Sequence, residues 1–257
     1  MRFLSPLHVG LLAITAVTLF SCNEKEDFTT DQLTDYQPLT VGKYITYRVD
    51  STVYTNFGRT TEVHKYQIKN VVDAVLTDAG GRPLYRINRF IRDTAGLTPW
   101  LAMNEGVYFV TLLPDQLEST EDNLRVIKFH LPIRDGYSWK GNKYLSDDPY
   151  KLLYTFSNDD NMVDWDFYYD GNPASFSYRT FNYSNVLSVE QADERFNVPI
   201  TIATSIAYKS RSVEKYSKGI GLVYREYEMW EYQPNPTDPA GPNKRGFGLV
   251  SWMIDHN

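Results

Sequence analysis

The stretch EVHKYQIKNVVDAVL, residues 62–76, decides the fold together with the turn and the returning segment behind it. Apolar residues such as Tyr66 and Ile68 alternate there with polar ones, which is the two-residue period of a β-strand with one wet face. The turn DAGG, residues 78–81, supplies glycines for a tight reversal, and residues 85–92 alternate in the same way on the return. The sequence therefore predicts a long antiparallel hairpin.

Similar patterns predict strands along most of the chain. They fall at residues 45–53, 107–113, 125–131, 152–156, 176–183, 186–191, 202–216, 222–232 and 247–254. The aromatic share of 15%, with 20 Tyr, agrees with this because aromatic residues favour strands. A short helix is expected near Pro114–Glu121. We therefore expect a mainly β protein, with antiparallel twisted sheet or sheets, barrel- or sandwich-like, and at most short helices.

Two segments of the predicted β-rich domain, residues 37–257, resemble each other. Residues 38–44 and 132–139 both run from a proline through an apolar residue and a glycine to an aromatic residue that opens a strand. Two sheet-forming halves that meet near residues 114–124 would explain this similarity, and so would coincidence.

The N-terminus has the organisation of an export signal. Arg2 is its only early charge, and residues 9–20 form an apolar run without an ionisable side chain. This run is too short to cross a membrane, which needs about 20 apolar residues. Leu19-Phe20-Ser21-Cys22 resembles the lipobox of bacterial lipoproteins. The resemblance implies that residues 1–21 are a cleaved signal peptide and that Cys22 is acylated, as with palmitate.

Cys22 is the only cysteine of the chain, so no disulfide can form within it. Acyl chains on Cys22 would anchor the protein in a membrane, since each buried CH₂ contributes about 0.8 kcal/mol. Residues 22–36 are rich in Asp and Glu, and we expect them to form an acidic flexible tether. Lys25-Glu26-Asp27 resembles the signal that sends Bacteroidota lipoproteins to the outer face of the outer membrane, although an ordinary acidic linker has the same composition.

Further motifs resemble a family of uncharacterised cell-envelope lipoproteins from Bacteroidota. They are the two proline-led segments already described, the hairpin motif at residues 216–224, which contains Lys218-Gly219-Ile220-Gly221-Leu222-Val223, and the closing residues 246–249. The resemblance covers most of residues 36–257. It implies an outer-membrane lipoprotein, on the periplasmic leaflet or at the cell surface, and it carries no activity.

Composition and motifs exclude several classes of function. The formal net charge is −6 and no basic cluster is visible, which argues against nucleic acid as a partner. His64, His130 and His256 lack the spacing of a zinc site, and no motif indicates a nucleophile or a nucleotide-binding loop. We therefore predict no catalytic residue, no metal site and no cofactor, and the sequence leaves open whether the protein is an enzyme.

The densest acidic and aromatic stretch, residues 159–172, suggests a binding surface for a ligand. Aromatic faces beside carboxylates can hold sugars, and Trp139 opens a strand nearby in sequence. The candidate ligand-binding residues are Trp139, Trp165, Tyr168, Tyr169 and Asp170.

Two functions compete on this basis. One is a lipid-anchored ligand- or glycan-binding or structural module that meets a glycan or an envelope protein. The other is a surface hydrolase, resembling a glycoside hydrolase, that uses Asp and Glu side chains in residues 159–170. An exposed loop beside an edge strand would also have this composition.

Overall fold

The computed structural model describes residues 31–237 and 239–257. The chain divides into Met1–Thr30, which lies outside the described residues, and a compact unit, Asp31–Asn257. The lipobox with Cys22, the predicted signal peptide and the export motif Lys25-Glu26-Asp27 all fall in the first part.

The unit that begins at Asp31 is mainly β, as predicted. Its strands are β1 Tyr44–Thr55, β2 Thr60–Thr77, β3 Pro83–Asp93, β4 Leu101–Leu112, β5 Gln116–Glu121, β6 Leu124–His130, β7 Ser138–Lys140, β8 Asp166–Tyr169, β9 Ala174–Tyr178, β10 Phe181–Phe196, β11 Ala207–Ser217, β12 Gly221–Gln233 and β13 Asn243–His256. The helical elements are α2, Leu33–Tyr36, and the 3₁₀ turn η2, Met162–Asp164.

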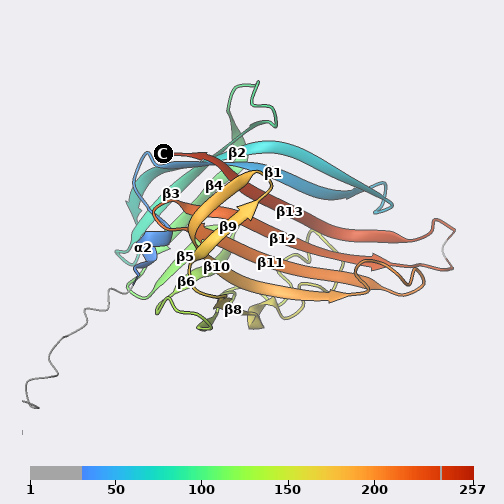
Figure 1. Ribbon diagram of the computed structural model, residues 1–257. Helices are drawn as coiled ribbons and strands as arrows, with labels where there is room; N and C mark the ends of the chain where they lie inside the picture. Colours follow the sequence, from blue (N-terminus) through green and yellow to red (C-terminus); the bar gives the residue numbers. More distant parts are fainter. Residues whose placement is uncertain (1–30, 238) are drawn as a thin grey trace, which may run out of the picture. The chain divides into compact units, whose positions relative to one another are not determined.

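All strands belong to one antiparallel sheet (Figure 1). Its order is β6-β5-β4-β3-β2-β1-β13-β12-β11-β10-β8-β7, and β9 pairs with β10. The predicted hairpin is confirmed as β2 and β3, which pair from Tyr66↔Asp93 to Thr77↔Pro83. Gly81 supplies the left-handed conformation of the turn, with φ +77°.

The two edges of this sheet meet, so that the sheet forms a nearly closed barrel. Beyond the last strand, the carbonyl oxygen of Gly141 accepts a hydrogen bond of 2.8 Å from the backbone N–H of Ile127 on β6. The indole Nε1 of Trp139 on β7 donates to the carbonyl oxygen of Ile127 at 2.9 Å. Both bonds join edges that are far apart in strand order.

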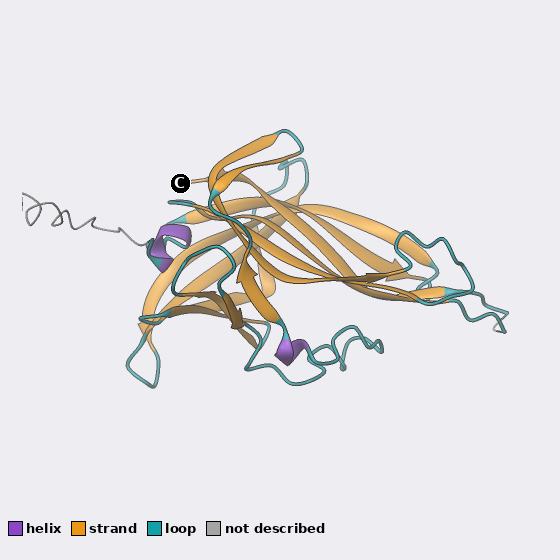
Figure 2. Cartoon of the chain, turned by 60° about the horizontal axis from the view of Figure 1, so that its bottom comes forward, coloured by secondary structure: helices purple, strands orange, loops and turns teal. Residues whose placement is uncertain are grey.

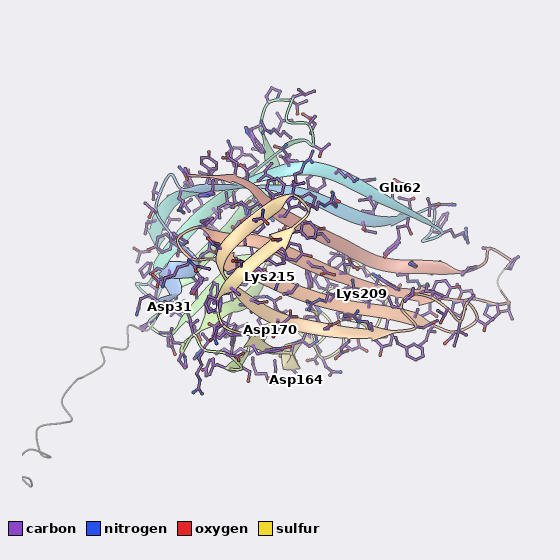
Figure 3. All side chains as sticks on the ribbon, viewed as in Figure 1. Asp31, Glu62, Asp164, Asp170, Lys209 and Lys215 are labelled. Atoms are coloured by element: carbon purple, nitrogen blue, oxygen red, sulfur yellow. The ribbon has the colours of Figure 1, made fainter. Side chains whose placement is uncertain are left out.

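One part of the barrel interior is filled by an apolar core that includes α2. Leu33 and Tyr36 of α2 are 4% and 0% exposed, and they belong to the same buried cluster as Phe129 and Leu187. Asp31, labelled beside α2 in Figure 3, accepts a hydrogen bond from the Tyr36 hydroxyl at 2.8 Å and pairs with Lys218. Residues 31–36, which the sequence assigns to the tether, are therefore part of the folded unit.

The outer face of β11, β12 and β13 is covered by the hairpin of β9 and β10 (Figure 1). Val213, Tyr224 and Trp252 are buried there against aromatic residues of the hairpin, among them Phe176 and Tyr178. Since this hairpin covers the outside, the side chains that alternate with these residues face the barrel interior.

Four strand or helix predictions are wrong in detail. The strand predicted at residues 176–183 is divided by a turn at residues 179–180 into the end of β9 and the start of β10. The expected helix near Pro114–Glu121 is strand β5, because its backbone pairs on both sides, with β4 and β6. Residues 152–156 form the end of a turn and an irregular segment instead of a strand, and the N–H groups of Leu153 and Tyr154 donate to the carbonyl of Tyr150. The start of the strand predicted at residues 202–216 is a loop as far as residue 206.

The chain does not divide into two sheets near residues 114–124. Hairpins β4–β5 and β5–β6 carry one ladder continuously through this region. Within residues 31–237 and 239–257, no helix has the length and apolarity needed to cross a membrane.

The closure of the barrel depends on the small size of Gly141. A Cβ at this position would lie 2.2 Å from the Phe167 ring, which is itself 1% exposed. We expect Gly141→Ala to lower the free energy of unfolding by about 1–3 kcal/mol, because the overpacked ring must shift the edge strands. Urea unfolding measures the loss. Gly80→Ala in the exposed β2–β3 turn is the matched control and should change stability by less than about 0.5 kcal/mol. Equal stability of the two variants would contradict this account of the closure.

Candidate functional site

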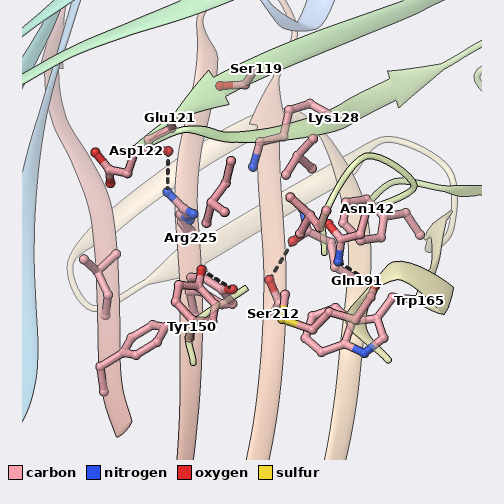
Figure 4. A pocket seen from close by; sticks show the side chains of 18 of the residues that line it. Ser119, Glu121, Asp122, Lys128, Asn142, Tyr150, Trp165, Gln191, Ser212 and Arg225 are labelled. Carbon is pink, nitrogen blue, oxygen red and sulfur yellow. Dashed lines mark hydrogen bonds and ion pairs between the residues drawn. The ribbon is translucent and has the colours of Figure 1, made fainter. Parts of the chain in front are cut away.

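The barrel interior contains a pocket of about 300 Å³ with one polar and one apolar end (Figure 4). Its polar lining consists of Arg89, Ser119, Glu121, Asp122, Lys128, Asn142, Gln191, Ser212 and Arg225. Its apolar and aromatic lining consists of Leu124, Val126, Leu145, Tyr150, Leu153, Tyr154, Met162, Trp165, Phe167, Tyr227, Phe247 and Leu249. A concave site with many apolar groups and a few convergent polar ones has the usual character of a small-molecule site.

Strand register brings the polar groups of the pocket together. Glu214 on β11 lies directly opposite Arg225 on β12, and Ser212 lies opposite Tyr227. Residues two apart along a strand share a face, so both pairs face the interior. Lys128 reaches the same region from β6 on the other side of the barrel.

Glu214 is the centre of the polar cluster and is 2% exposed. Its Oε1 lies 2.8 Å from the Lys128 Nζ and 3.4 Å from the Arg225 Nε. Its Oε2 accepts hydrogen bonds from Gln191 Nε2 at 2.9 Å and from the Tyr216 hydroxyl at 2.8 Å. Four groups thus satisfy one buried carboxylate, as burial of a charge requires.

Glu121 extends the cluster towards β3. Its Oε1 lies 2.5 Å from Arg89 Nη1, and its Oε2 lies 3.4 Å from Arg225 Nη1. Arg89 Nη2 also contacts Asp122 Oδ1 at 3.1 Å, at a side chain that is 60% exposed. Arg225 therefore bridges the two inner carboxylates, Glu121 and Glu214.

The cluster keeps both inner carboxylates ionised. Burial by itself would raise the pKa of Glu214, but the charges of Lys128 and Arg225 and the hydrogen bonds lower that pKa to about 2. Burial likewise opposes ionisation of Glu121, and Arg225, Arg89 and Lys128 lower its pKa. Burial by itself would lower the pKa of Arg225, but the negative charges of Glu121 and Glu214 outweigh burial and raise that pKa above its ordinary value. The guanidinium therefore stays charged.

A long segment between β7 and β8, residues 141–165, supplies aromatic and aliphatic residues of the pocket lining, among them Tyr150, Tyr154 and Trp165. Figure 2 shows that the helical elements are short and that long loops join some of the strands. The hydroxyls of Tyr150 and Tyr227 are 2.7 Å apart, and the Tyr150 ring meets Phe247 edge to face. Asn158 Nδ2 lies 3.0–3.1 Å from the carbonyl oxygens of Lys209 and Trp230. Hydrogen bonds thus fix this segment to the sheet on more than one side.

A second cavity of about 70 Å³ lies beyond the polar cluster. It shares Ser119, Glu121, Lys128 and Arg225 with the larger pocket, and Glu214 lines it as well. The polar cluster therefore forms the boundary between the two cavities.

The five ligand-binding residues predicted from sequence do not form one surface. Trp139 and Tyr169 are 7% and 0% exposed and belong to the core, where their rings lie 4.8 Å apart. Tyr168 alternates with Tyr169 along β8 and is 41% exposed, and Asp170 is exposed. Of the five, Trp165 alone lines the 300 Å³ pocket.

The carboxylates in residues 159–170 have varied surroundings. Asp159 is buried and accepts a hydrogen bond from the Tyr150 N–H at 2.9 Å. Asp166 forms an ion pair of 2.9 Å with Lys140. Asp164 and Asp170, which Figure 3 labels, are exposed. Among the described residues, no three His, Cys, Asp or Glu side chains gather in a way that could hold a metal ion.

Lys128, Glu214 and Arg225 are absent from the residues predicted by sequence. Each lies in a segment that the sequence predicts to be a strand, at a position whose polarity is typical of a solvent face. The available signal was the spacing of charged and aromatic residues: Arg225 lies two residues before Tyr227, and Glu214 lies two residues before Tyr216. Residues two apart on a strand share a face, so the spacing indicates a face with both charged and aromatic side chains. It could not indicate that this polar face lies inside.

The buried Glu214 carboxylate makes stability depend on acidic pH. Its folded pKa of about 2 lies below the ordinary 4.5, so its contribution is complete above about pH 5 and is lost as the pH falls towards 2. We expect Glu214→Gln to destabilise the protein by about 3 kcal/mol at neutral pH and by much less near pH 2–3. Urea unfolding at a series of pH values measures this, with Glu194→Gln at an exposed site as the control. A pH-independent difference between Glu214→Gln and wild type would contradict the assignment.

No protein-family model matches the chain, and the search of curated proteins finds no significant match.

Proposed function

We propose that this protein is a lipid-anchored binding protein of the cell envelope, which holds a small molecule inside its barrel. The observation that carries the proposal is the pocket of about 300 Å³, in which apolar and aromatic side chains face a cluster of buried polar groups. Apolar walls supply affinity through burial, and the polar groups at one end orient the ligand.

Binding fits the polar cluster better than catalysis does. A general acid or base works best with a pKa near the working pH. The pKa values of Glu214 and Glu121 are instead lowered by the surrounding cations, and Glu214 already accepts from Lys128, Gln191 and Tyr216. These carboxylates position cations and are poor proton donors.

The inner pocket is a better candidate for the ligand than the stretch at residues 165–170. Capture of a glycan by Trp165, Tyr168 and Asp170 would need one shared face, and strand alternation separates Tyr168 from the pocket that Trp165 lines. The hydrolase alternative would need a carboxylate pair free to act across a cleft, and Asp159 and Asp166 are already bonded to Tyr150 and Lys140.

The proposed anchor is Cys22 in the lipobox, which would hold the barrel at the outer membrane. The lipobox lies nine residues before Asp31, where the folded unit starts. This places few residues between the proposed lipid and the barrel. With Lys25-Glu26-Asp27 as an export signal, the barrel would face the outside of the cell; without it, the periplasm.

The pocket can be tested by filling it. Val126 lines the pocket, so Val126→Trp should occupy its space and weaken binding of the neutral fluorescent probe N-phenyl-1-naphthylamine by about tenfold or more. Val75→Trp makes the same exchange at an exposed strand position and should leave binding unchanged. A fluorescence titration, with thermal unfolding of both variants, gives the result. Equal binding by the two variants, or no binding by wild type, would rule out the pocket.

The anchor can be tested at Cys22. Cys22→Ala removes the only thiol of the chain, so we expect an uncleaved precursor without labelled palmitate and with loss from the membrane fraction. Metabolic labelling and fractionation in a bacterial host measure both effects, with Ser21→Ala as a control that keeps a small residue before the cysteine. Normal labelling of the Cys22→Ala protein would refute lipidation at this site.

A further inference from the structure

We infer that the ligand of the pocket is a neutral molecule with an apolar body and a carbonyl group, a ketone or an ester, whose oxygen accepts hydrogen bonds from Lys128 and Ser119. This inference rests on the proposed function, because it names the chemical class of the molecule held in the same pocket. Two properties of the polar end support it: the hydrogen bonds that its donors leave unmade, and the pairing of its charges.

Donors without an acceptor remain at the polar end of the pocket. Lys128 has three N–H donors, its side chain is 13% exposed, and it makes one hydrogen bond, to Glu214. Ser119 is 6% exposed, and its hydroxyl has no hydrogen-bond partner in the part of the chain that the structure describes. Arg225 uses Nε and Nη1 for Glu214 and Glu121, and its Nη2 makes no hydrogen bond to a described residue. These groups can donate to a ligand.

The side-chain acceptors beside these donors already have partners. Each carboxylate oxygen of Glu214 contacts two donor groups, and each oxygen of Glu121 lies beside an arginine. Gln191 Oε1 accepts a hydrogen bond of 2.6 Å from the Ser212 hydroxyl. A buried acceptor without a partner, Asn70 Oδ1, belongs to a residue that lines the 70 Å³ cavity but not the 300 Å³ pocket. The polar end of the pocket therefore fits a hydrogen-bond acceptor better than a donor.

The charges of Lys128 and Arg225 are already shared with carboxylates. Lys128 Nζ lies 2.8 Å from Glu214, and Arg225 lies 3.4 Å from Glu214 through Nε and 3.4 Å from Glu121 through Nη1. Both carboxylates are ionised, so an anionic head group would meet like charges next to the donors that it needs. It would also lose its own hydration. A neutral carbonyl oxygen accepts the same hydrogen bonds without this repulsion.

The free donors converge on one place. Ser119, Lys128 and Arg225 all line both the 300 Å³ pocket and the 70 Å³ cavity next to it. Figure 4 shows the three residues at one end of the pocket, with Tyr150 and Trp165 at the other. A carbonyl oxygen has two lone pairs, so at this boundary it would accept one charge-assisted hydrogen bond from Lys128 and one from Ser119. The apolar body of the ligand would extend towards the aromatic rings.

Three ligands with the same heptyl tail and nearly the same shape test the head group. 2-Nonanone has the carbonyl oxygen, 2-methyl-1-nonene has a CH₂ group in place of that oxygen, and octanoate has a charged head. Each competes with N-phenyl-1-naphthylamine for the pocket of the full chain at neutral pH. We expect 2-nonanone to bind about tenfold or more tightly than octanoate, because the charge of octanoate is repelled and desolvated. The ratio of the affinities for 2-nonanone and 2-methyl-1-nonene in wild type is the reference for the variants.

Variants at the free donors assign the preference for a carbonyl. Lys128→Met should lower the 2-nonanone to 2-methyl-1-nonene ratio by about tenfold, because a charged donor is lost. Ser119→Ala keeps the ion pairs and should lower the ratio by about threefold, which keeps the test decisive if Lys128→Met does not fold. The matched control is Lys140→Met, which should leave the ratio unchanged, since Lys140 pairs with Asp166 and does not line the pocket.

A variant at Glu121 tests the charge argument. Glu121→Gln removes one of the like charges beside Arg225, so it should strengthen the binding of octanoate relative to 2-nonanone by about fivefold. An unchanged ratio of these two ligands would contradict the role given to the carboxylates.

The outcomes separate this inference from the proposed function. If the probe binds but wild type, Lys128→Met and Ser119→Ala give the same ratio of 2-nonanone to 2-methyl-1-nonene, the carbonyl assignment fails and the binding pocket stands. If octanoate binds to wild type as tightly as 2-nonanone, the neutral head group is wrong. If no probe binds to wild type, the proposed function itself fails.

Discussion

The structure depends on the meeting of the two edges of one antiparallel sheet. An open sheet with edges at β6 and β7 would expose unpaired backbone groups and could enclose nothing. The backbone bond from Ile127 to Gly141 and the indole bond from Trp139 join these edges. Closure converts one face of the strands into an interior, which is what makes a pocket geometrically available.

Closure also imposes a requirement on the interior. Charged side chains that face inwards leave bulk water, and their burial is costly unless they are paired. The four partners of Glu214 and the position of Arg225 between two carboxylates meet this requirement. The same requirement explains why the apolar core with Phe129 and α2 occupies one part of the interior while the pocket occupies another.

The proposed function connects the cluster with the pocket, and so does the structure. Lys128 and Arg225 are held in place by Glu214 and Glu121, so their remaining N–H donors are oriented before a ligand arrives. Preorganised donors cost less entropy on binding than mobile ones. The segment of residues 141–165 adds the aromatic contact of Tyr150 with Phe247 and Tyr227. A rigid polar end and an aromatic end together suit an amphipathic molecule of small size.

The sequence by itself determined that the chain is antiparallel β, and it placed most strands, because the alternation of side chains and the glycines at turns are local properties. Local patterns also gave a wrong prediction at Gln116 and Glu118. The composition there favours a helix, but these residues lie in strand β5, which pairs with β4 and β6. The aromatic side chains at positions 165–170 are adjacent in sequence, but Tyr168 and Tyr169 lie on opposite faces of β8 because side chains alternate along a strand. Tertiary structure alone decided that the polar face of β11 and β12 is the inside of the barrel. The physical reason is that a two-residue period gives two faces of a strand, and only the curl of the whole sheet selects which face encloses Glu214 and Arg225.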